Sequence, residues 1–169
     1  MTTDNAGEST SRKQLGPAMA LVAAALLAIG SLTSAWWQSE GDQQQTYQVG
    51  LFRAEICRGD DCTSRTLAGL GIDATWSKMG GAALGGALTS GMLLLIMAMS
   101  FGRKDWRRHL GWVTAVMVLF TASLVVMAHL RKPFDEVSPG WGLFVGFLGL
   151  GLALMASGLR LVAARPPAE

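Results

Sequence analysis

Four long runs without a single charged residue constrain this chain more than any other feature of its sequence. They are residues 15–37, 79–102, 110–128 and 140–159. An α-helix needs about 20 apolar residues to cross the ~30 Å hydrocarbon core of a bilayer, and each run is of that length. No run alternates apolar and polar residues, which excludes the strands of a membrane barrel. The sequence therefore predicts an all-α membrane protein with a bundle of four transmembrane helices.

The links between the runs complete this predicted architecture. Pro17 and Pro139 suit the first turns of the first and fourth helices, because the missing N–H of proline costs nothing there. A cleaved signal peptide with a small-residue site at residues 33–35 is the alternative for the first span. The expected order is a disordered cytoplasmic tail (1–14), a first transmembrane helix (15–37), a long outer loop (38–75), a second helix (76–102), a basic cytoplasmic loop (103–109), a third helix (110–130), a short outer loop (131–139), a fourth helix (140–162) and a cytoplasmic tail (163–169).

All six tryptophans lie at or near the ends of the four runs. The indole ring has an apolar body and a polar N–H, so it prefers the boundary between membrane and water. We therefore expect these residues to mark the membrane boundaries. They are Trp36, Trp37, Trp76, Trp106, Trp112 and Trp141.

Basic residues predict how the helices are oriented. The loop of residues 103–109 carries Arg103, Lys104, Arg107 and Arg108, and Arg12 and Lys13 flank the first helix on the same side. The long loop of residues 38–75 has more acidic than basic residues. By the positive-inside rule, both termini are expected in the cytoplasm and the long loop outside the plasma membrane. The net charge is only +2, which gives no reason to expect a nucleic-acid partner.

The long outer loop holds both cysteines of the chain. Residues 46–56 partly alternate and favour a strand, and residues 63–67 favour a second strand. A four-residue tip at 58–61 would join them in a hairpin and place Cys57 opposite Cys62. Both cysteines lie on the side predicted to be oxidising, and no Cys-x-x-Cys motif or neighbouring histidine indicates redox or metal chemistry. We therefore expect a Cys57–Cys62 disulfide.

The tip of this hairpin is a candidate for contact with a protein partner. It reads Arg58-Gly59-Asp60-Asp61, so an Arg-Gly-Asp tripeptide lies within a disulfide ring, as in integrin-binding peptides. The simpler interpretation is a charged turn in which glycine and aspartate serve the backbone conformation. Both interpretations place these four residues at an exposed tip.

A second set of loop residues resembles a known family. Trp37 is followed by Gly50-Leu51-Phe52 and then by Cys57 and Cys62. This pattern, together with four spans and a large first outer loop, resembles the claudin and peripheral myelin protein group. The resemblance implies that Trp37 anchors the membrane rim, that residues 50–52 rest on the helices, and that the cysteines are bonded across a small sheet. Three features depart from the group's pattern: Phe52 stands where the group has tryptophan, the spacing from Trp37 to Gly50 is shorter, and the two cysteines are closer together. No paracellular pore is therefore implied.

Small residues recur at spacings of four on the predicted helices. Gly81 and Gly85 lie on the second helix, and Gly142 and Gly146 lie on the fourth. In lipid, small residues let helix backbones approach closely. Packing within the bundle is the main interpretation, and a seam between subunits is the alternative.

Catalytic chemistry is not indicated anywhere in the sequence. No nucleophile, base and acid stand together, and no phosphate-binding loop or metal-ligand cluster is present. His109 and His129 are expected at opposite ends of the third helix, too far apart to hold one haem. We therefore expect no cofactor, no metal and no small-molecule substrate. The predicted function is that of a non-enzymatic protein of the lipid bilayer that presents its outer loop to a protein partner or to a second copy. The alternatives are an accessory subunit of a respiratory or transport complex and a small oligomeric channel.

Overall fold

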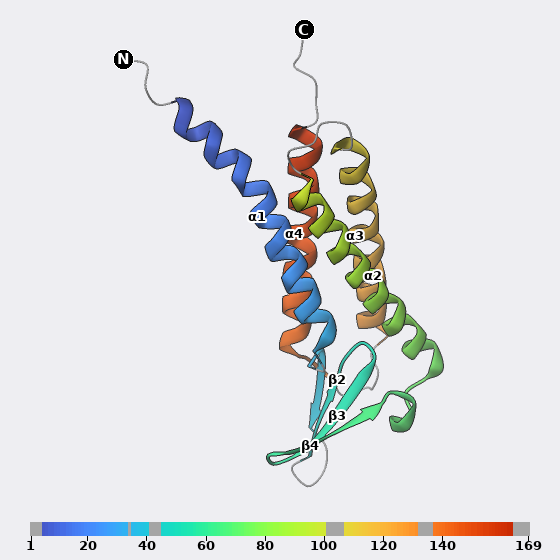
Figure 1. Cartoon of the computed structure of the whole chain (residues 1–169). Helices are drawn as coiled ribbons and strands as arrows, with labels where there is room; N and C mark the ends of the chain where they lie inside the picture. Colours follow the sequence, from blue (N-terminus) through green and yellow to red (C-terminus); the bar gives the residue numbers. More distant parts are fainter. Residues whose placement is uncertain (1–4, 34, 41–44, 101–106, 132–136, 164–169) are drawn as a thin grey trace.

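The chain forms four long helices that lie side by side and a small sheet at one end of them (Figure 1). The computed structural model describes residues 5–33, 35–40, 45–100, 107–131 and 137–163. All four helices are long and apolar enough to cross a membrane, which indicates an integral membrane protein. They are α1 (Asn5–Leu32), α2 (Ala74–Met99), α3 (Arg107–Leu130) and α4 (Trp141–Ala163).

The first helix differs from the prediction at both ends. It begins at Asn5, so the prediction of a disordered tail is wrong for residues 5–14. Pro17 consequently lies inside the helix and not in its first turn. Extending a formed helix costs far less than starting one, which lets α1 continue into its polar flank. At its other end α1 stops at Leu32, five residues before the predicted end at Trp37, because Trp37 begins a strand.

The other three helices lie close to their predicted spans. Asp73 caps the start of α2, where its carboxylate accepts a hydrogen bond of 3.1 Å from the Thr75 N–H. Residues 103–106 of the predicted basic loop, most of the predicted short outer loop (132–136) and residues 164–169 of the predicted tail lie outside the described residues. The last two residues of the short outer loop, Ser138 and Pro139, form a strand.

The sheet is antiparallel and has the strand order β4-β3-β2-β1-β5. Its strands are β1 (Trp37–Glu40), β2 (Gln45–Val49), β3 (Arg53–Arg58), β4 (Asp61–Thr66) and β5 (Ser138–Pro139). The small sheet predicted for the long loop is thus present, but the single strand predicted over residues 46–56 is wrong. The Gly50 N–H donates to the Arg53 carbonyl oxygen at 2.8 Å, which folds that stretch into a hairpin of β2 and β3. A 3-10 turn, η2 (Ala68–Leu70), follows β4.

The predicted small-residue pairs behave differently on the two helices. A side chain on Gly142 or Gly146 would meet the ring of Trp36, so both glycines allow the close packing expected of them. Gly81 and Gly85 are exposed, and a side chain on either would meet no atom within 4 Å. Packing of that pair within the bundle is therefore a wrong prediction. Two neighbours make the contacts instead: Gly80 lies against Leu51 and Gly86 against Thr121.

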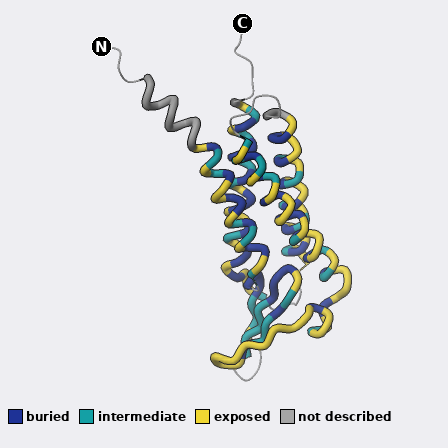
Figure 2. The backbone as a smooth tube through the Cα atoms, in the orientation of Figure 1, coloured by how far each residue is buried: buried dark blue, intermediate teal, exposed yellow. Residues whose placement is uncertain are grey.

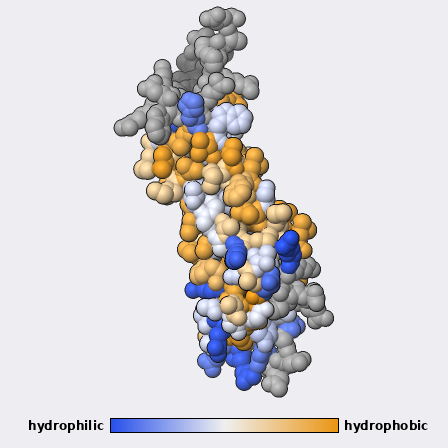
Figure 3. Space-filling view, turned by 90° about the vertical axis from the view of Figure 1, so that its right-hand side faces the viewer, coloured by the Kyte–Doolittle hydropathy of each residue, from blue (hydrophilic) through white to orange (hydrophobic). Residues whose placement is uncertain are grey.

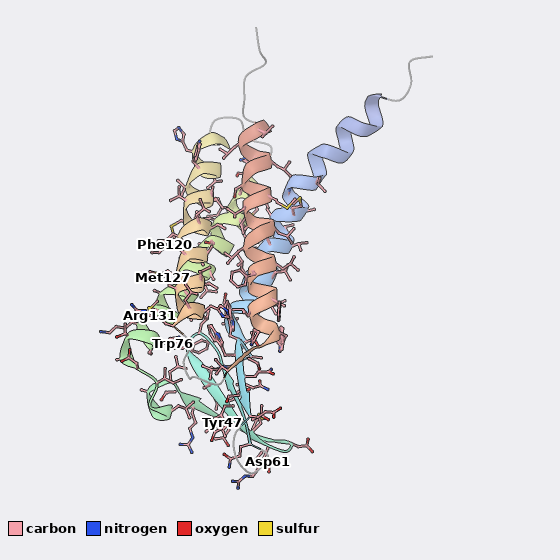
Figure 4. All side chains as sticks on the ribbon, turned by 180° about the vertical axis from the view of Figure 1, so that it is seen from behind. Tyr47, Asp61, Trp76, Phe120, Met127 and Arg131 are labelled. Carbon is pink, nitrogen blue, oxygen red and sulfur yellow. A yellow bond between two sulfur atoms is a disulfide. The ribbon has the colours of Figure 1, made fainter. Side chains whose placement is uncertain are left out.

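The outer surface of the helices is strongly apolar. Figure 3 shows hydrophobic residues gathered over the helical part of the molecule and hydrophilic residues gathered at the sheet end. Large apolar side chains such as Phe120 and Met127 project away from α3 into the surroundings (Figure 4). Burial of these side chains requires lipid or another protein, because the bundle itself does not cover them.

Candidate functional site

The sheet has two edges of very different character. The β5 edge has only two residues, one of them Pro139, which has no N–H to offer. The β4 edge has six residues, Asp61–Thr66, and all six are exposed. Figure 2 shows this strand as part of a continuous exposed stretch at the end of the molecule away from the helices. Among the described strands only β3 pairs with β4, so its other side is an open edge.

The tip between β3 and β4 is fixed by the predicted disulfide. Cys57 and Cys62 are bonded, and their Cα atoms are 4.1 Å apart. Gly59 has φ of +59°, a left-handed conformation that glycine adopts without strain. The tip is tighter than predicted, because Arg58 and Asp61 pair with each other and leave Gly59 and Asp60 as a two-residue turn. All four residues are exposed, and Asp61 lies at the end of the molecule farthest from the helices (Figure 4).

Removal of this disulfide is expected to act on the hairpin alone. The two bonded cysteines are separated by five positions in the sequence, so the bridge closes a small loop. The chain-entropy relation gives about 2 kcal/mol for so small a loop. Replacing both cysteines by serine should therefore increase hydrogen exchange in β3 and β4 and leave exchange in the helices unchanged. Hydrogen-exchange mass spectrometry of the wild type and the variant measures this difference. Equal loosening of β1 and the helices would contradict this prediction.

The spacing of the cysteines also shows which backbone groups of β4 face outward. Opposite residues of an antiparallel pair lie about 4.5 Å apart where they do not exchange hydrogen bonds and about 5.5 Å apart where they do. Since Cys57 and Cys62 are 4.1 Å apart, they form a pair without hydrogen bonds. The same holds for every second pair along the ladder, including Ser64 with Glu55. The N–H and C=O of Ser64 therefore point to the open edge.

The second part of the site is the joint between the sheet and the helices. Three tryptophans are buried there: Trp36, Trp37 and Trp76. The rings of Trp37 and Trp76 meet edge to face with centroids 5.3 Å apart. These three lie near the ends of α1 and α2, but their rings are covered by protein and not by lipid headgroups. Their position at a membrane boundary stays a prediction. Trp112 and Trp141 are exposed, as a boundary position requires, and Trp106 lies outside the described residues.

Backbone contacts complete the joint. The Gly140 N–H donates to the Trp36 carbonyl oxygen at 2.8 Å, and the Gly142 N–H donates to the Ala35 carbonyl oxygen at 2.9 Å. These bonds connect the start of α4 to the chain that enters β1. They involve residues about a hundred positions apart, which no local sequence pattern reveals.

The Gly50–Leu51–Phe52 candidates lie at the same joint. Leu51 is fully buried and its carbonyl oxygen lies against Gly80 of α2. Phe52 is 41% exposed, and the Arg53 guanidinium lies 5.5 Å from its ring centroid. Trp37 and Leu51 are thus internal contacts of the protein, and of these loop candidates Phe52 and the tip residues are accessible to a partner.

Arg160 is a buried cation that connects two helices, a role that its position in the sequence does not reveal. It lies in the last turn of α4 and is only 1% exposed. Its guanidinium donates to the Ser100 carbonyl oxygen at 3.1 Å and to the Met97 carbonyl oxygen at 3.4 Å. These carbonyls are at the C-terminal end of α2, where a cation is favourable. Arg160 therefore joins α4 to α2 at the end of the bundle away from the sheet.

The described residues contain no group of three histidine, cysteine or acidic side chains that could hold a metal ion. The chain is thus a four-helix protein with membrane-length helices and a five-stranded sheet at one end. No protein-family model matches its sequence, and no curated protein matches it either. The resemblance to the claudin and peripheral myelin protein group accordingly stays a prediction.

Proposed function

We propose that this chain is a non-enzymatic membrane protein that binds a protein partner through the open edge of β4. The helices hold the sheet at the membrane surface, and the disulfide fixes the hairpin that presents the edge. Both termini lie in the cytoplasm and the sheet outside the plasma membrane in this proposal, which follows from the distribution of basic residues. Reporter fusions after Lys104 and Gly41 test that orientation, with an inside and an outside signal expected respectively.

The observation that carries the proposal is the contrast between the two edges of one sheet. Proteins commonly protect edge strands by making them short or by placing proline or charges in them. The β5 edge follows this rule with two residues and Pro139. The β4 edge does not, because it offers six exposed residues and only Asp61 and Arg65 are charged. An open edge of this length can accept an extended segment of another chain as an added strand.

Ser64 provides the sharpest test of strand addition. Its N–H points to the open edge, so Ser64→Pro removes a donor that a partner strand would use without removing a hydrogen bond to β3. Proline is tolerated at such positions. We expect Ser64→Pro to reduce partner binding at least about tenfold, the effect of losing an interaction of roughly 1.4 kcal/mol. Binding is measured by the yield of cross-linked adduct from a photoreactive residue at Thr63 in intact membranes.

Ser64→Ala is the matched control, because alanine keeps the N–H and removes only the hydroxyl. It should give the wild-type yield of adduct. The mass of the adduct separates a second copy of this chain from a different protein. Equal yields from the proline and alanine variants, or no adduct from either, would contradict binding through the β4 edge.

A second candidate function is that of an accessory subunit in a larger membrane complex. It is favoured by Gly81 and Gly85, which leave an exposed, uncovered strip on α2 where another helix backbone could approach closely. Gly81→Ile together with Gly85→Ile would then abolish co-purification of the other subunits, whereas Ser64→Pro would leave it unchanged.

A further inference from the structure

His129 lies at the joint between the sheet and the helices, where it contacts the buried Trp37. The Trp37 indole N–H donates to the His129 Nδ1 atom at 3.4 Å, and the planes of the two rings are inclined by 20°. The imidazole is half-buried, whereas Trp37 is only 1% exposed. Nδ1 accepts a hydrogen bond only while it carries no proton. The observed contact therefore requires the neutral form of His129 with its proton on Nε2.

We propose that His129 and Trp37 form a proton-responsive latch between the helix bundle and the sheet. Histidine is the side chain that normally changes its charge between about pH 5 and pH 8. When Nδ1 binds a proton it becomes a donor, so two N–H groups face each other and the hydrogen bond is lost. The Trp37 N–H is then left without its acceptor in a buried position, which is unfavourable. Acidification thus releases Trp37 from α3.

An attraction between the charged imidazolium and the indole ring does not compensate for this loss. A cation attracts an aromatic ring most strongly within about 6 Å of the centroid. The centroids of His129 and Trp37 are 6.4 Å apart, so the attraction of an imidazolium to the indole face is small. The direct N–H to Nδ1 contact is the interaction that protonation changes most.

No charged side chain among the described residues of the surrounding elements forms an ion pair with His129. Asp73, just before α2, is engaged as the helix cap. Three other charged side chains nearby are exposed: Lys78 of α2, Glu40 of β1 and Arg131, which follows α3. Figure 4 shows Arg131 directed outward from this end of the bundle. Lys132, Asp135 and Glu136 of the link to β5 lie outside the described residues.

Release of Trp37 acts directly on the sheet. Trp37 is the first residue of β1 and pairs with Val49 of β2 and Pro139 of β5. The neighbouring Trp36 carries the hydrogen bond from Gly140 at the start of α4. Loss of the Trp37 contact therefore loosens the strand that attaches the sheet to the bundle. The inference is independent of the β4 edge, since it concerns how the sheet is held and not what it binds.

Fluorine NMR of protein labelled with 5-fluorotryptophan, in detergent micelles or nanodiscs, tests the latch. Trp37→Phe assigns the Trp37 signal. In the wild type this signal should shift in a single transition between pH 8 and pH 5. His109→Gln removes the other histidine of the chain, which is exposed at the opposite end of α3, and should leave the transition unchanged. His129→Gln offers a neutral acceptor that does not titrate, and it should abolish the transition.

Hydrogen exchange supplies a second measurement that does not depend on the fluorine label. Once the intrinsic pH dependence of exchange is divided out, β1 amides of the wild type should lose about tenfold of their protection between pH 8 and pH 5. Trp37→Phe keeps an aromatic side chain but removes the indole N–H, so its β1 protection should not change with pH. A Trp37 signal that does not move in the wild type, or that still moves in His129→Gln, would overturn the proposal.

Discussion

Replacing Trp36 by alanine is expected to lower the free energy of unfolding by about 3–5 kcal/mol, the usual cost of truncating a buried tryptophan. The side chain is 2% exposed, and its ring fills the space that Gly146 leaves on α4. Its indole N–H donates to the Gly30 carbonyl oxygen of α1. Alanine would leave a cavity between α1 and α4 and an acceptor without its donor. The measurement is the unfolding free energy in mixed detergent micelles, followed by circular dichroism.

Trp141→Ala is the matched control for that experiment. Trp141 begins α4, lies near the same joint and is 51% exposed. Its truncation removes the same atoms but leaves no internal cavity, so the unfolding free energy should change by less than about 1 kcal/mol. A comparable loss in both variants would show that size and not burial sets the effect, contrary to the packing described for Trp36.

The helices were predictable because their signal is long and local. Four uncharged runs of membrane length correspond to α1 through α4, and the interior of each helix coincides with its run. Helix ends were less predictable, because they depend on contacts that are distant in sequence. Trp36 and Trp37 are apolar whether they continue α1 or enter the joint. Trp37 pairs with Pro139 in the sheet and not with the preceding turn of α1. No sequence pattern around either residue predicts this pairing.

Within the candidate site, features formed by residues close in sequence were likewise predictable, and features formed by distant residues were not. The Cys57–Cys62 pair was predictable because a hairpin brings together residues only five positions apart. Burial of Trp37 was not, since an indole at the end of an apolar run has the same pattern whether it meets lipid headgroups or another part of the protein. The glycines of α2 illustrate the limit for helix faces. Small residues stand on every side of that helix, so the sequence alone could not separate the exposed Gly81 and Gly85 from the packed Gly80 and Gly86.

Gly80→Ala is expected to lower the free energy of unfolding by about 3 kcal/mol, at the upper end of the usual cost of overpacking. A methyl group at this position would overlap the carbonyl oxygen of Leu51. That oxygen belongs to the backbone of the turn between β2 and β3, and Leu51 is itself fully buried. No side-chain rotation can relieve the overlap, so the whole turn must move away from α2. The loss is measured by the same unfolding titration as for Trp36→Ala.

Gly81→Ala separates packing from helix propensity, because the two glycines are adjacent in one helix. Alanine gains up to about 1 kcal/mol over glycine in a helix interior, and both variants receive that gain. At Gly81 the added methyl group meets no atom within 4 Å, so only the gain remains. The variants should therefore differ by about 3 kcal/mol or more in favour of Gly81→Ala. Equal stabilities would mean that the turn leaves α2 at no cost, in which case the joint would be held by the tryptophans and the Gly140 hydrogen bond without help from Leu51.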